Sequence, residues 1–330
     1  MKKSKCVVSG GCGFIGAYLV RELVRRNWSV VVVDNCMRGS AKRLTQVMDQ
    51  IEFVSTDIRD KEALLDAFRG SKAVFHLAAV NGTENFYNHP ELVLDVGVRG
   101  MLAVVDACKE LGICELVVAS SAEVYQKPHV VPTDENIPLM LPDSLNPRYS
   151  YGGSKIVSEL IAFNYGLKHF RKLQVFRPHN VYGPDMGWKH VAPQIIQRAL
   201  LSERKTRSKS FDFEIKGDGS ETRAFAYIDD IVDGIICMYE NGGHREIYHI
   251  GNDQEVSISQ FVQLVGEILG YEFNIKTTPA PEGGTPRRCP NIGKMKAIGY
   301  QPKIDLREGL KRTCDWYLHN IDQELDNHLL

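Results

Sequence analysis

Hydrophobic positions in the first half of the chain follow two patterns, short apolar runs and longer segments with helical spacing. Cys6 to Val8 is an apolar run that ends in glycines, and Phe14 to Arg26 then places apolar residues at helical intervals. A second apolar run occupies Ser29 to Val33. These patterns predict a strand, a tight glycine turn, a helix and a second strand.

The same alternation continues and predicts further strands and helices. The predicted strands are 52–58, 73–79, 115–121 and 173–177, and the predicted helices are 61–68, 90–111 and 153–169. Asp60 is a suitable N-cap for the first of these helices. Repeated strand and helix of this kind indicates an α/β fold built on a doubly wound parallel sheet.

Ligands bind beyond the carboxyl ends of the strands in such sheets, so residues at these ends are candidates for a site. The residues expected there are Asp34, Asp57, Ala78, Ser121 and Pro178. Asp57 has two interpretations from spacing alone, because it either flanks a bound base or caps the helix that follows.

The alternation of strands and helices ends beyond Gly183, where the chain becomes rich in Pro, Gly and charged residues. Helices are expected at 191–201 and 226–239, strands at 211–216 and 247–250, and a capping box at Ser257 to Gln260 opens a helix that runs to 269. We therefore expect two units. The larger unit comprises 1–183 plus 226–250, and a smaller α/β lobe comprises 184–225 plus 251–330.

Composition excludes several classes of protein. The 330 residues are 43% hydrophobic and 25% charged, with a net charge of -1, so neither nucleic acid nor an anionic membrane is an expected partner. The basic run at 204–209 is read as a solvated loop. The N-terminal apolar run ends at glycine too early for a signal peptide or a membrane span, which favours a cytoplasmic protein. Neither the eight cysteines nor the ten histidines show metal-ligand spacing, so no metal is expected.

The glycine turn and the second strand carry the first chemical signal. Glycines at 10, 13 and 16 permit a tight turn, close approach to a pyrophosphate and close packing of helix on strand. A glycine cluster alone is also typical of plain turns. Asp34, eighteen residues after Gly16, strengthens the prediction because its carboxylate can accept bonds from the adenosine ribose hydroxyls and would repel a 2′-phosphate. The pattern therefore predicts NAD rather than NADP.

Tyr151 and Lys155 form the second chemical signal. They stand four residues apart at the start of a predicted helix, so they project from one face. A neighbouring ammonium favours the phenolate, which can take a proton from a sugar hydroxyl as hydride leaves the same carbon. Ser121 ends the fifth predicted strand and can hydrogen-bond the reacting oxygen. A Tyr and a Lys four residues apart occur often by chance. The position of this pair after the fifth predicted strand is what makes it a candidate site.

Seven motifs together resemble one family. They are GGCGFIG, VVVDN, TDI, HLAA, SSAEVY, YGGSK and RPHNVYGP, and KGDGSETRAFAYIDD and TPRRCP extend the likeness to about residue 290. The chain resembles the extended short-chain dehydrogenase/reductase family of nucleotide-sugar epimerases and dehydratases, which have a Rossmann-type domain. The resemblance implies that NAD contacts Gly10, Gly13, Phe14, Ile15, Gly16, Asp34, Asn35, Asp57, Ile58, Leu77, Ala78, Ala79, Tyr151, Lys155 and Pro178. It also implies that Asn180, Arg223 and Arg287 hold the nucleotide diphosphate of the substrate, with Ser121 at the sugar.

The segment SSAEVY narrows the choice within this family. The 4,6-dehydratases carry Thr-Asp-Glu where this chain has Ser121, Ala122 and Glu123, and the missing Asp disfavours that reaction. The 4-epimerases carry Ser-Ala-Thr, so two of three positions agree. Glu123 either moves a proton at a neighbouring carbon or serves as a structural hydrogen-bond partner. Lys189 resembles a proton donor of the GDP-mannose 3,5-epimerases, although the partner cysteine of those enzymes falls at Glu123.

We therefore expect an NAD-dependent nucleotide-sugar epimerase that inverts carbon 4 through a 4-keto intermediate, in polysaccharide or deoxysugar precursor synthesis. The alternatives are a 3,5-epimerase, a 4,6-dehydratase, a decarboxylase and a 4-ketoreductase, and a non-enzymatic NAD-sensing protein. One departure from the family is Gly97, where relatives usually have Asn. The likeness also implies a homodimer packed through the helices at 90–111 and 153–169.

Overall fold

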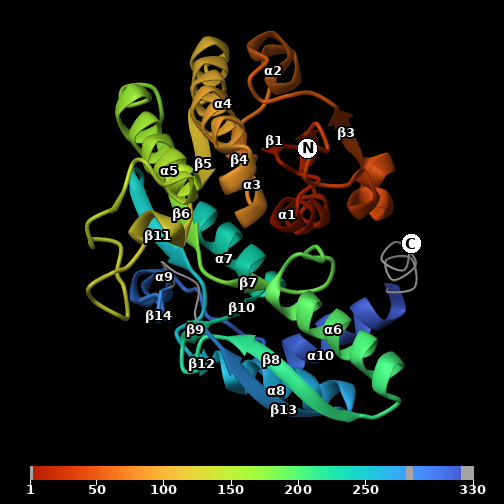
Figure 1. Ribbon diagram of the computed structural model, residues 1–330. Helices are drawn as coiled ribbons and strands as arrows, with labels where there is room; N and C mark the ends of the chain where they lie inside the picture. Colours follow the sequence, from red (N-terminus) through yellow and green to blue (C-terminus); the bar gives the residue numbers. More distant parts are fainter. Residues whose placement is uncertain (1–2, 280–284, 321–330) are drawn as a thin grey trace.

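A sheet of seven strands forms the centre of the computed structural model, which describes residues 3–279 and 285–320. Its strands are β1 (Lys5–Ser9), β2 (Ser29–Val33), β3 (Ile51–Val54), β4 (Ala73–His76), β5 (Glu115–Ala119), β6 (Lys172–Pro178) and β11 (Glu246–Ile250). Their order is β11-β6-β5-β4-β1-β2-β3, and every neighbouring pair is parallel (Figure 1). The predicted α/β fold with a doubly wound parallel sheet is confirmed.

Helices cover both faces of this sheet (Figure 1). One face packs against α1 (Phe14–Arg25) and α7 (Ile228–Asn241), and the other against α2 (Lys61–Phe68), α4 (Pro90–Leu111) and α5 (Ser150–Leu160). Side chains alternate along each strand, so Cys6 and Val8 enter the first core and Val7 enters the second. A strand that is buried on both faces must be apolar throughout, which explains the continuous apolar runs of the sequence.

The ends of two helices follow local rules. Helix α4 has Pro90 in its first turn and stops before Gly112, which takes a left-handed conformation with φ 69°. Helix α8 (Ile258–Leu269) begins with the predicted capping box, in which Ser257 accepts from the Gln260 backbone and the Gln260 side chain accepts from the Ser257 backbone. Both helices therefore begin where the sequence predicts.

The smaller part of the molecule contains short sheets and helices. Strands β8 (Ser210–Lys216) and β13 (Glu272–Thr278) pair in parallel, and β9 (Thr222–Ala224) lies between β12 (Glu255–Ser257) and β14 (Arg287–Arg288). Helices α6 (Val191–Thr206), α8 and α10 (Leu306–Asn320) pack together beneath them. One apolar core runs from this part to the α7 face of the sheet. Residues 321–330 of the expected smaller lobe lie outside the described residues.

Short elements complete the chain. They are η1 (Ala41–Gln50), α3 (Thr83–Asn88), η2 (Ala122–Tyr125), η3 (Pro147–Tyr149), η4 (Ile161–Tyr165), β7 (Val181–Tyr182), β10 (Ala226–Tyr227) and α9 (Gly293–Ala297). Within the described ranges, no helix combines the length and the apolar character that a membrane crossing requires.

Several predicted elements have different bounds in the structure. The strands predicted at 73–79 and 115–121 end earlier, at His76 of β4 and Ala119 of β5, and the helix predicted at 191–201 continues to Thr206 of α6. The strand predicted at 52–58 is the shorter β3, which ends at Val54. It lies at the edge of the sheet, with β2 as its neighbour on one side, and Asp57 beyond it bonds Arg59 and Asn35. The helix predicted at 226–239 starts two residues later, since Ala226 and Tyr227 pair with β7. The helix predicted at 153–169 starts at Ser150 and passes into the π-turn η4. The basic run is not wholly a loop, because 204–206 belong to α6.

A buried charged network lies between α5 and β6. The Arg177 guanidinium donates to both carboxylate oxygens of Glu159, at 2.8 and 2.6 Å, and these side chains are 2% and 5% exposed. The Ser120 hydroxyl also donates to Glu159. Arg177 further contacts the Tyr125 hydroxyl, which lies 2.7 Å from His249 Nε2. The network holds a full ion pair in the interior, directly behind the carboxyl end of β5.

Candidate active site

A cleft opens where the strand order reverses, between β1 and β4 at their carboxyl ends. Its empty volume is about 540 Å³, part of which is open to solvent. The predicted cofactor residues that line it are Gly10, Gly13, Asp34, Asn35, Asp57, Ile58, Leu77, Ala78 and Ala79. The other lining residues were not predicted to contact the cofactor, and of these only Thr56 belongs to a quoted motif, TDI. They are Met37, Arg38, Gly39, Thr56, Val80 and Val96. Most of these lie in loops without a motif, which is why sequence spacing did not indicate them.

Two glycines of the turn are required by close backbone contacts. Gly10 has φ 76°, and a Cβ there would lie 2.6 Å from the backbone nitrogen of Ala78. A Cβ on Gly16 would lie 2.1 Å from the Gly10 carbonyl oxygen. Helix α1 starts after Gly13 without a side-chain cap, so its first N–H groups have no side-chain acceptor. The turn therefore brings uncapped donors to the edge of the cleft, an arrangement that suits a phosphate.

Asp34 is held at the other side of this turn. Its two carboxylate oxygens accept from the backbone N–H of Cys12 at 2.9 Å and of Cys36 at 2.8 Å. Each oxygen keeps further lone pairs for a ligand in the cleft. The carboxylate, the glycine turn and the uncapped helix together fit the adenosine half of a dinucleotide. The predicted cofactor residues that do not line this cleft are Phe14, Ile15, Gly16, Tyr151, Lys155 and Pro178.

Asp57 has protein partners of its own. It binds Arg59 through both oxygens and accepts from the Asn35 amide at 3.1 Å. Arg59 holds the pKa of this carboxyl below its usual value, mainly through their hydrogen bond. Asp57 is therefore an ionised residue at the rim of the cleft whose side chain organises the loop after β3.

Tyr151 and Lys155 lie on one face of α5 and turn toward the end of β5. The Lys155 ammonium donates to the Ala119 carbonyl at 2.7 Å and lies 5.8 Å from the centre of the Tyr151 ring. Ser121 follows the same strand and hydrogen-bonds to Tyr151. Helix periodicity and the strand end thus bring the three predicted catalytic side chains together.

Burial shifts both pKa values in this group toward the neutral forms. Burial raises the pKa of Tyr151 to about 12, although the hydrogen bond from Ser121 opposes the shift. Burial also lowers the pKa of Lys155 to about 8, against the attraction of Glu159. A lysine of this pKa is still largely cationic at neutral pH, so it can favour the phenolate when the hydroxyl loses its proton.

Phe86 is a contact that the sequence did not indicate. Its ring stacks on Tyr151 with centroids 5.1 Å apart and planes 14° apart. It belongs to the short helix α3, which also carries Glu84. The Lys189 ammonium forms an ion pair with Glu84, and both side chains are exposed. The structure therefore places Lys189 at an exposed ion pair and does not bring it to Glu123.

Glu123 lies among arginines beside the group formed by Ser121, Tyr151 and Lys155. Its carboxylate accepts from Arg288 at 2.6 Å, and these side chains are 28% and 15% exposed. Burial raises the pKa of Glu123, but the charges of Arg288, Arg148 and Arg223 outweigh this effect and hold it below its usual value. One carboxylate among three guanidinium groups leaves a surplus of positive charge, which suits an anionic substrate.

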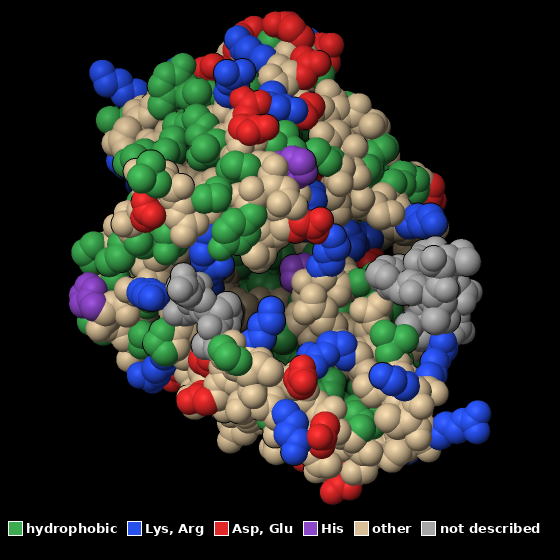
Figure 2. Space-filling view, viewed as in Figure 1, with side chains coloured by type: hydrophobic (Ala, Val, Ile, Leu, Met, Phe, Trp, Pro, Cys, Tyr) green, Lys and Arg blue, Asp and Glu red, His purple; other side chains and the backbone are tan. Residues whose placement is uncertain are grey.

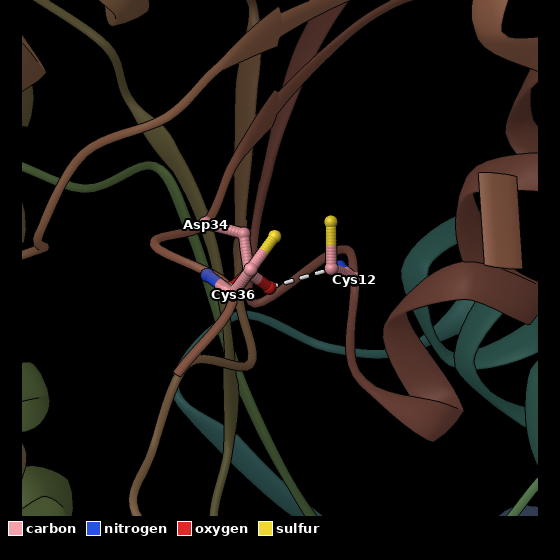
Figure 3. A group of neighbouring side chains, drawn as sticks. All are labelled: Cys12, Asp34 and Cys36. Atoms are coloured by element: carbon pink, nitrogen blue, oxygen red, sulfur yellow. Dashed lines mark hydrogen bonds between the residues drawn. The ribbon is translucent and has the colours of Figure 1, made fainter. Parts of the chain in front are cut away.

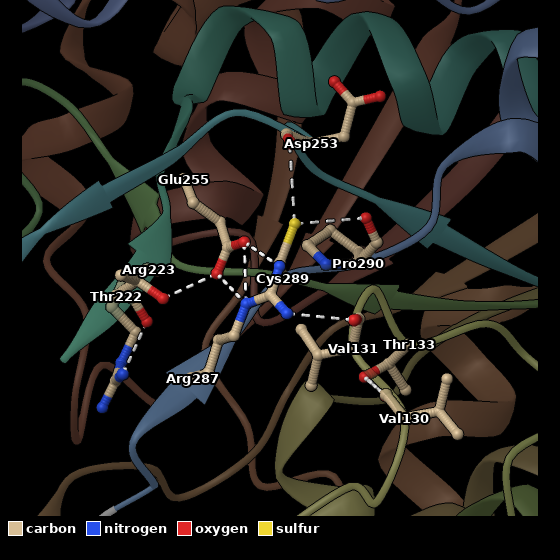
Figure 4. A network of polar contacts seen from close by, with 10 residues as sticks. All are labelled: Val130, Val131, Thr133, Thr222, Arg223, Asp253, Glu255, Arg287, Cys289 and Pro290. Atoms are coloured by element: carbon tan, nitrogen blue, oxygen red, sulfur yellow. Dashed lines mark hydrogen bonds and ion pairs between the residues drawn. The ribbon is translucent and has the colours of Figure 1, made fainter.

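The three residues predicted to hold the diphosphate differ in their contacts and in the direction of their side chains. Arg287 binds Glu255 through two hydrogen bonds of 2.9 Å from Nε, and also donates to the Val131 carbonyl (Figure 4). Arg223 points away from Glu255 in this view. Asn180 has φ 40° and donates to the Ala224 carbonyl at 3.2 Å. Arg288, which was not predicted, is the member of the Arg287–Arg288 pair that reaches Glu123.

Gly97 sits at a helix crossing. A Cβ on Gly97 of α4 would lie 2.7 Å from the Cβ of Ser154 on α5, and Ser158 donates to the Gly97 carbonyl at 3.1 Å. The missing side chain thus allows α4 and α5 to approach closely beneath Tyr151 and Lys155. Glycine is required here because there is no room for a side chain between α4 and α5, and not because of its backbone conformation.

The smaller lobe closes one side of the site. A hollow lies between it and the sheet, with Lys and Arg side chains along its rim (Figure 2). This distribution agrees with the positive surplus around Glu123. An elongated anionic ligand would place one end in the cleft or in the hollow. Its negative charge would then lie beside the Lys and Arg side chains of the rim.

Known proteins share this architecture. The model of the NAD dependent epimerase/dehydratase family matches residues 6–251. A proposed UDP-glucose 4-epimerase from Methanocaldococcus jannaschii is 30% identical, over 95% of this chain and 98% of its own length. A UDP-N-acetyl-alpha-D-glucosaminuronate decarboxylase from Bacillus cytotoxicus is 29% identical, over 96% and 98%. A UDP-glucose 4-epimerase from Thermotoga maritima, solved with UDP-glucose, has a TM-score of 0.85 at 26% identity, over 96% and 99%.

Proposed function

The chain belongs to the NAD dependent epimerase/dehydratase family, and from that premise we propose that it is a nucleotide-sugar epimerase that inverts carbon 4 of its substrate. The observation that carries the proposal is the group formed by Ser121, Tyr151 and Lys155 at the end of β5, beside a cleft built for a dinucleotide. Ala122 at the centre of SSAEVY is the side chain of a 4-epimerase rather than the acid of a dehydratase.

NAD, when bound, supplies the acceptor for the hydride that leaves carbon 4 and then returns it. In our proposal Asp34 accepts bonds from the adenosine ribose, and the N-terminus of α1 faces the pyrophosphate. Lys155 holds the nicotinamide ribose. The unit 1–183 plus 226–250 thus carries the cofactor, whereas 184–225 plus 251–330 carries the substrate nucleotide.

Tyr151 moves the proton. Its hydroxyl, ionised with help from Lys155, takes the proton of the sugar hydroxyl at carbon 4 and gives it back after the sugar has turned. Ser121 holds the reacting oxygen so that the proton path remains short. The stacked Phe86 ring limits rotation of Tyr151 and keeps water from one side of it. The net reaction involves no redox change.

The substrate is a nucleotide diphosphate sugar in this proposal. Asn180, Arg223 and Arg287 are proposed to hold its diphosphate, and Arg288, which contacts Glu123, is a further cation near the proposed site. For Arg287 this role requires a change of partner, because its side chain now binds Glu255. Gripping the diphosphate alone leaves the sugar free to rotate between its two orientations.

A nucleotide-sugar decarboxylase is the second candidate. The positive surplus around Glu123 would suit a sugar that carries a carboxylate, and several relatives are decarboxylases that act on UDP-linked uronic acids. A 4-keto sugar with a carboxylate on carbon 5 is a β-keto acid, which loses carbon dioxide readily. A 3,5-epimerase is less well supported, since Glu123 and Lys189 belong to separate ion pairs.

A proton NMR time course in deuterated buffer tests the reaction. We expect one member of a panel of UDP, GDP, dTDP and CDP sugars to be inverted at carbon 4 without added cofactor and without deuterium uptake. Internal return of hydride gives this result. Deuterium at carbon 3 or 5 with inversion would replace the proposal with a 3,5-epimerase, and loss of carbon 6 from a uronic acid would replace it with a decarboxylase.

A homodimer is proposed on the exposed apolar side chains of α4, α5 and η4. Leu94, Val157, Leu160 and Tyr165 are 43, 37, 56 and 49% exposed, and hydrophobic side chains gather over α5 in Figure 2. We expect light scattering to give a dimer mass, and Leu160→Glu to give a monomer because a charge would be buried at the interface. Leu145→Glu, at a 90% exposed loop position, is the matched control. A monomeric wild type would contradict the proposal.

A further inference from the structure

Two thiols and a carboxylate meet behind the glycine turn. The ligand atoms of Cys12, Asp34 and Cys36 all lie within 4.8 Å of one another (Figure 3). Cys12 is fully buried and Cys36 is partly buried. Neither cysteine lines the cleft, although Asp34 does. The cluster thus shares one residue with the predicted cofactor site and places two soft donors beside it.

Backbone hydrogen bonds to Asp34 hold the chain segments of both cysteines close together. One Asp34 oxygen accepts from Cys12 N–H and the other from Cys36 N–H, so the carboxylate links the two chain segments. Cys36 has φ 56°, a left-handed conformation that costs a non-glycine residue energy and that the bond to Asp34 helps to offset. Both sulfur atoms then point to the same side of the turn (Figure 3). The arrangement is set by the backbone and not by a flexible side chain.

We propose that Cys12, Cys36 and Asp34 form a binding site for a thiophilic divalent cation of the zinc class. Thiolate ligands select such ions over magnesium or calcium, and two sulfurs with one carboxylate leave a fourth tetrahedral position for water. Ligand atoms around one zinc lie roughly 3.8 Å apart, given a Zn–S bond of about 2.3 Å. Small rotations of the two cysteine side chains bring the cluster to that spacing.

Charge and protons balance in this step. Binding of the cation displaces one proton from each thiol, and both protons go to solvent without any oxidation or reduction. Two thiolates and the Asp34 carboxylate then carry three negative charges against two positive charges on the ion. The ion and its three ligands then carry one net negative charge. Arg43 donates to the Cys12 carbonyl at 3.1 Å, but its guanidinium also pairs with Asp185 at 3.0 Å, so it reduces that charge only in part.

The site makes the cation and NAD compete, an inference that rests on the proposed role of Asp34. In this inference the Asp34 carboxylate, which already accepts two backbone N–H bonds, uses its remaining lone pairs either for the ribose hydroxyls or for the metal ion. Linkage then requires that NAD weaken cation binding by the same factor by which the cation weakens NAD binding. The cluster would act as an inhibitory metal site.

Cobalt(II) titration of the reduced full-length protein, with and without bound NAD, tests the site. We expect one equivalent to bind to the NAD-free protein with thiolate-to-cobalt absorption, to be displaced by zinc, and to bind at least tenfold more weakly when NAD is present. Cys12→Ser and Cys36→Ser should each weaken binding at least tenfold, in line with losses of 10–100-fold for lesser changes at metal sites.

Cys114→Ser is the matched control, since Cys114 is also partly buried and lies outside the cluster. It should bind cobalt as the wild type does, and thermal melting should show all variants folded. Absence of thiolate absorption, or equal binding by Cys36→Ser, would overturn the site. Cobalt binding that NAD does not weaken would support the metal site and overturn the competition between cation and NAD. Failure of the epimerase assay would contradict the proposed function without changing either cobalt measurement.

Discussion

Tyr151→Phe should lower kcat by roughly 10²–10⁴-fold, the range that general acid–base groups contribute. The substitution removes only the hydroxyl that carries the proton, while the ring and its stack on Phe86 remain. We expect NAD content and thermal stability close to those of the wild type. The measurement is the rate of carbon-4 inversion by NMR, together with bound NAD released by denaturation.

Tyr271→Phe provides the control for loss of a phenol. Tyr271 lies in the smaller lobe and its hydroxyl donates to Glu203 at 2.5 Å, away from the cleft. This variant should keep wild-type kcat. Full activity of Tyr151→Phe would disprove the proton-transfer role, and a wild type that binds NAD but transforms no nucleotide sugar would favour the NAD-sensing alternative.

Breaking the Glu159–Arg177 pair should be the most destabilising single change that we predict. Glu159→Leu leaves the Arg177 charge buried without its carboxylate, and Arg177→Met leaves the carboxylate without its cation. Loss of one partner from a buried ion pair costs about 3–5 kcal/mol in the free energy of unfolding. Denaturant titration followed by circular dichroism measures this change.

The double variant Glu159→Leu/Arg177→Met separates charge from packing. It should lose much less stability than the sum of the single variants, because no unpaired charge remains. Glu240→Leu is the surface control, since its bond to Arg26 is exposed and contributes about 0–1 kcal/mol. Additive losses in the double variant would show that the pair does not act as a unit.

Features governed by local rules were predictable from the sequence. Proline in the first turn and glycine after the last turn defined α4, and the capping box defined the start of α8. The glycine turn and Asp34 fall at the cleft for the same reason, since each follows directly from a strand end. In these cases the residues that decide the conformation are neighbours in sequence.

Features decided by tertiary contact were not predictable. Arg287 and Arg288 are consecutive residues of a two-residue strand, so their side chains point to opposite sides, and nothing in the sequence says which one faces Glu123. Phe86 stacks on Tyr151 across a separation of 65 residues, so helical or strand periodicity does not reveal it. The meeting of Cys12 with Cys36 likewise depends on how two loops pack.

The contact of Gly97 with Ser154 restricts the order in which substitutions can accumulate. A Cβ on residue 97 would lie 2.7 Å from the Cβ of residue 154, so two side chains cannot occupy this crossing without displacement of a helix. The asparagine that the family resemblance leads us to expect at position 97 therefore requires a prior change of Ser154 to glycine. The pair is epistatic, and transplanting single residues from relatives into this helix crossing should fail where a paired exchange succeeds.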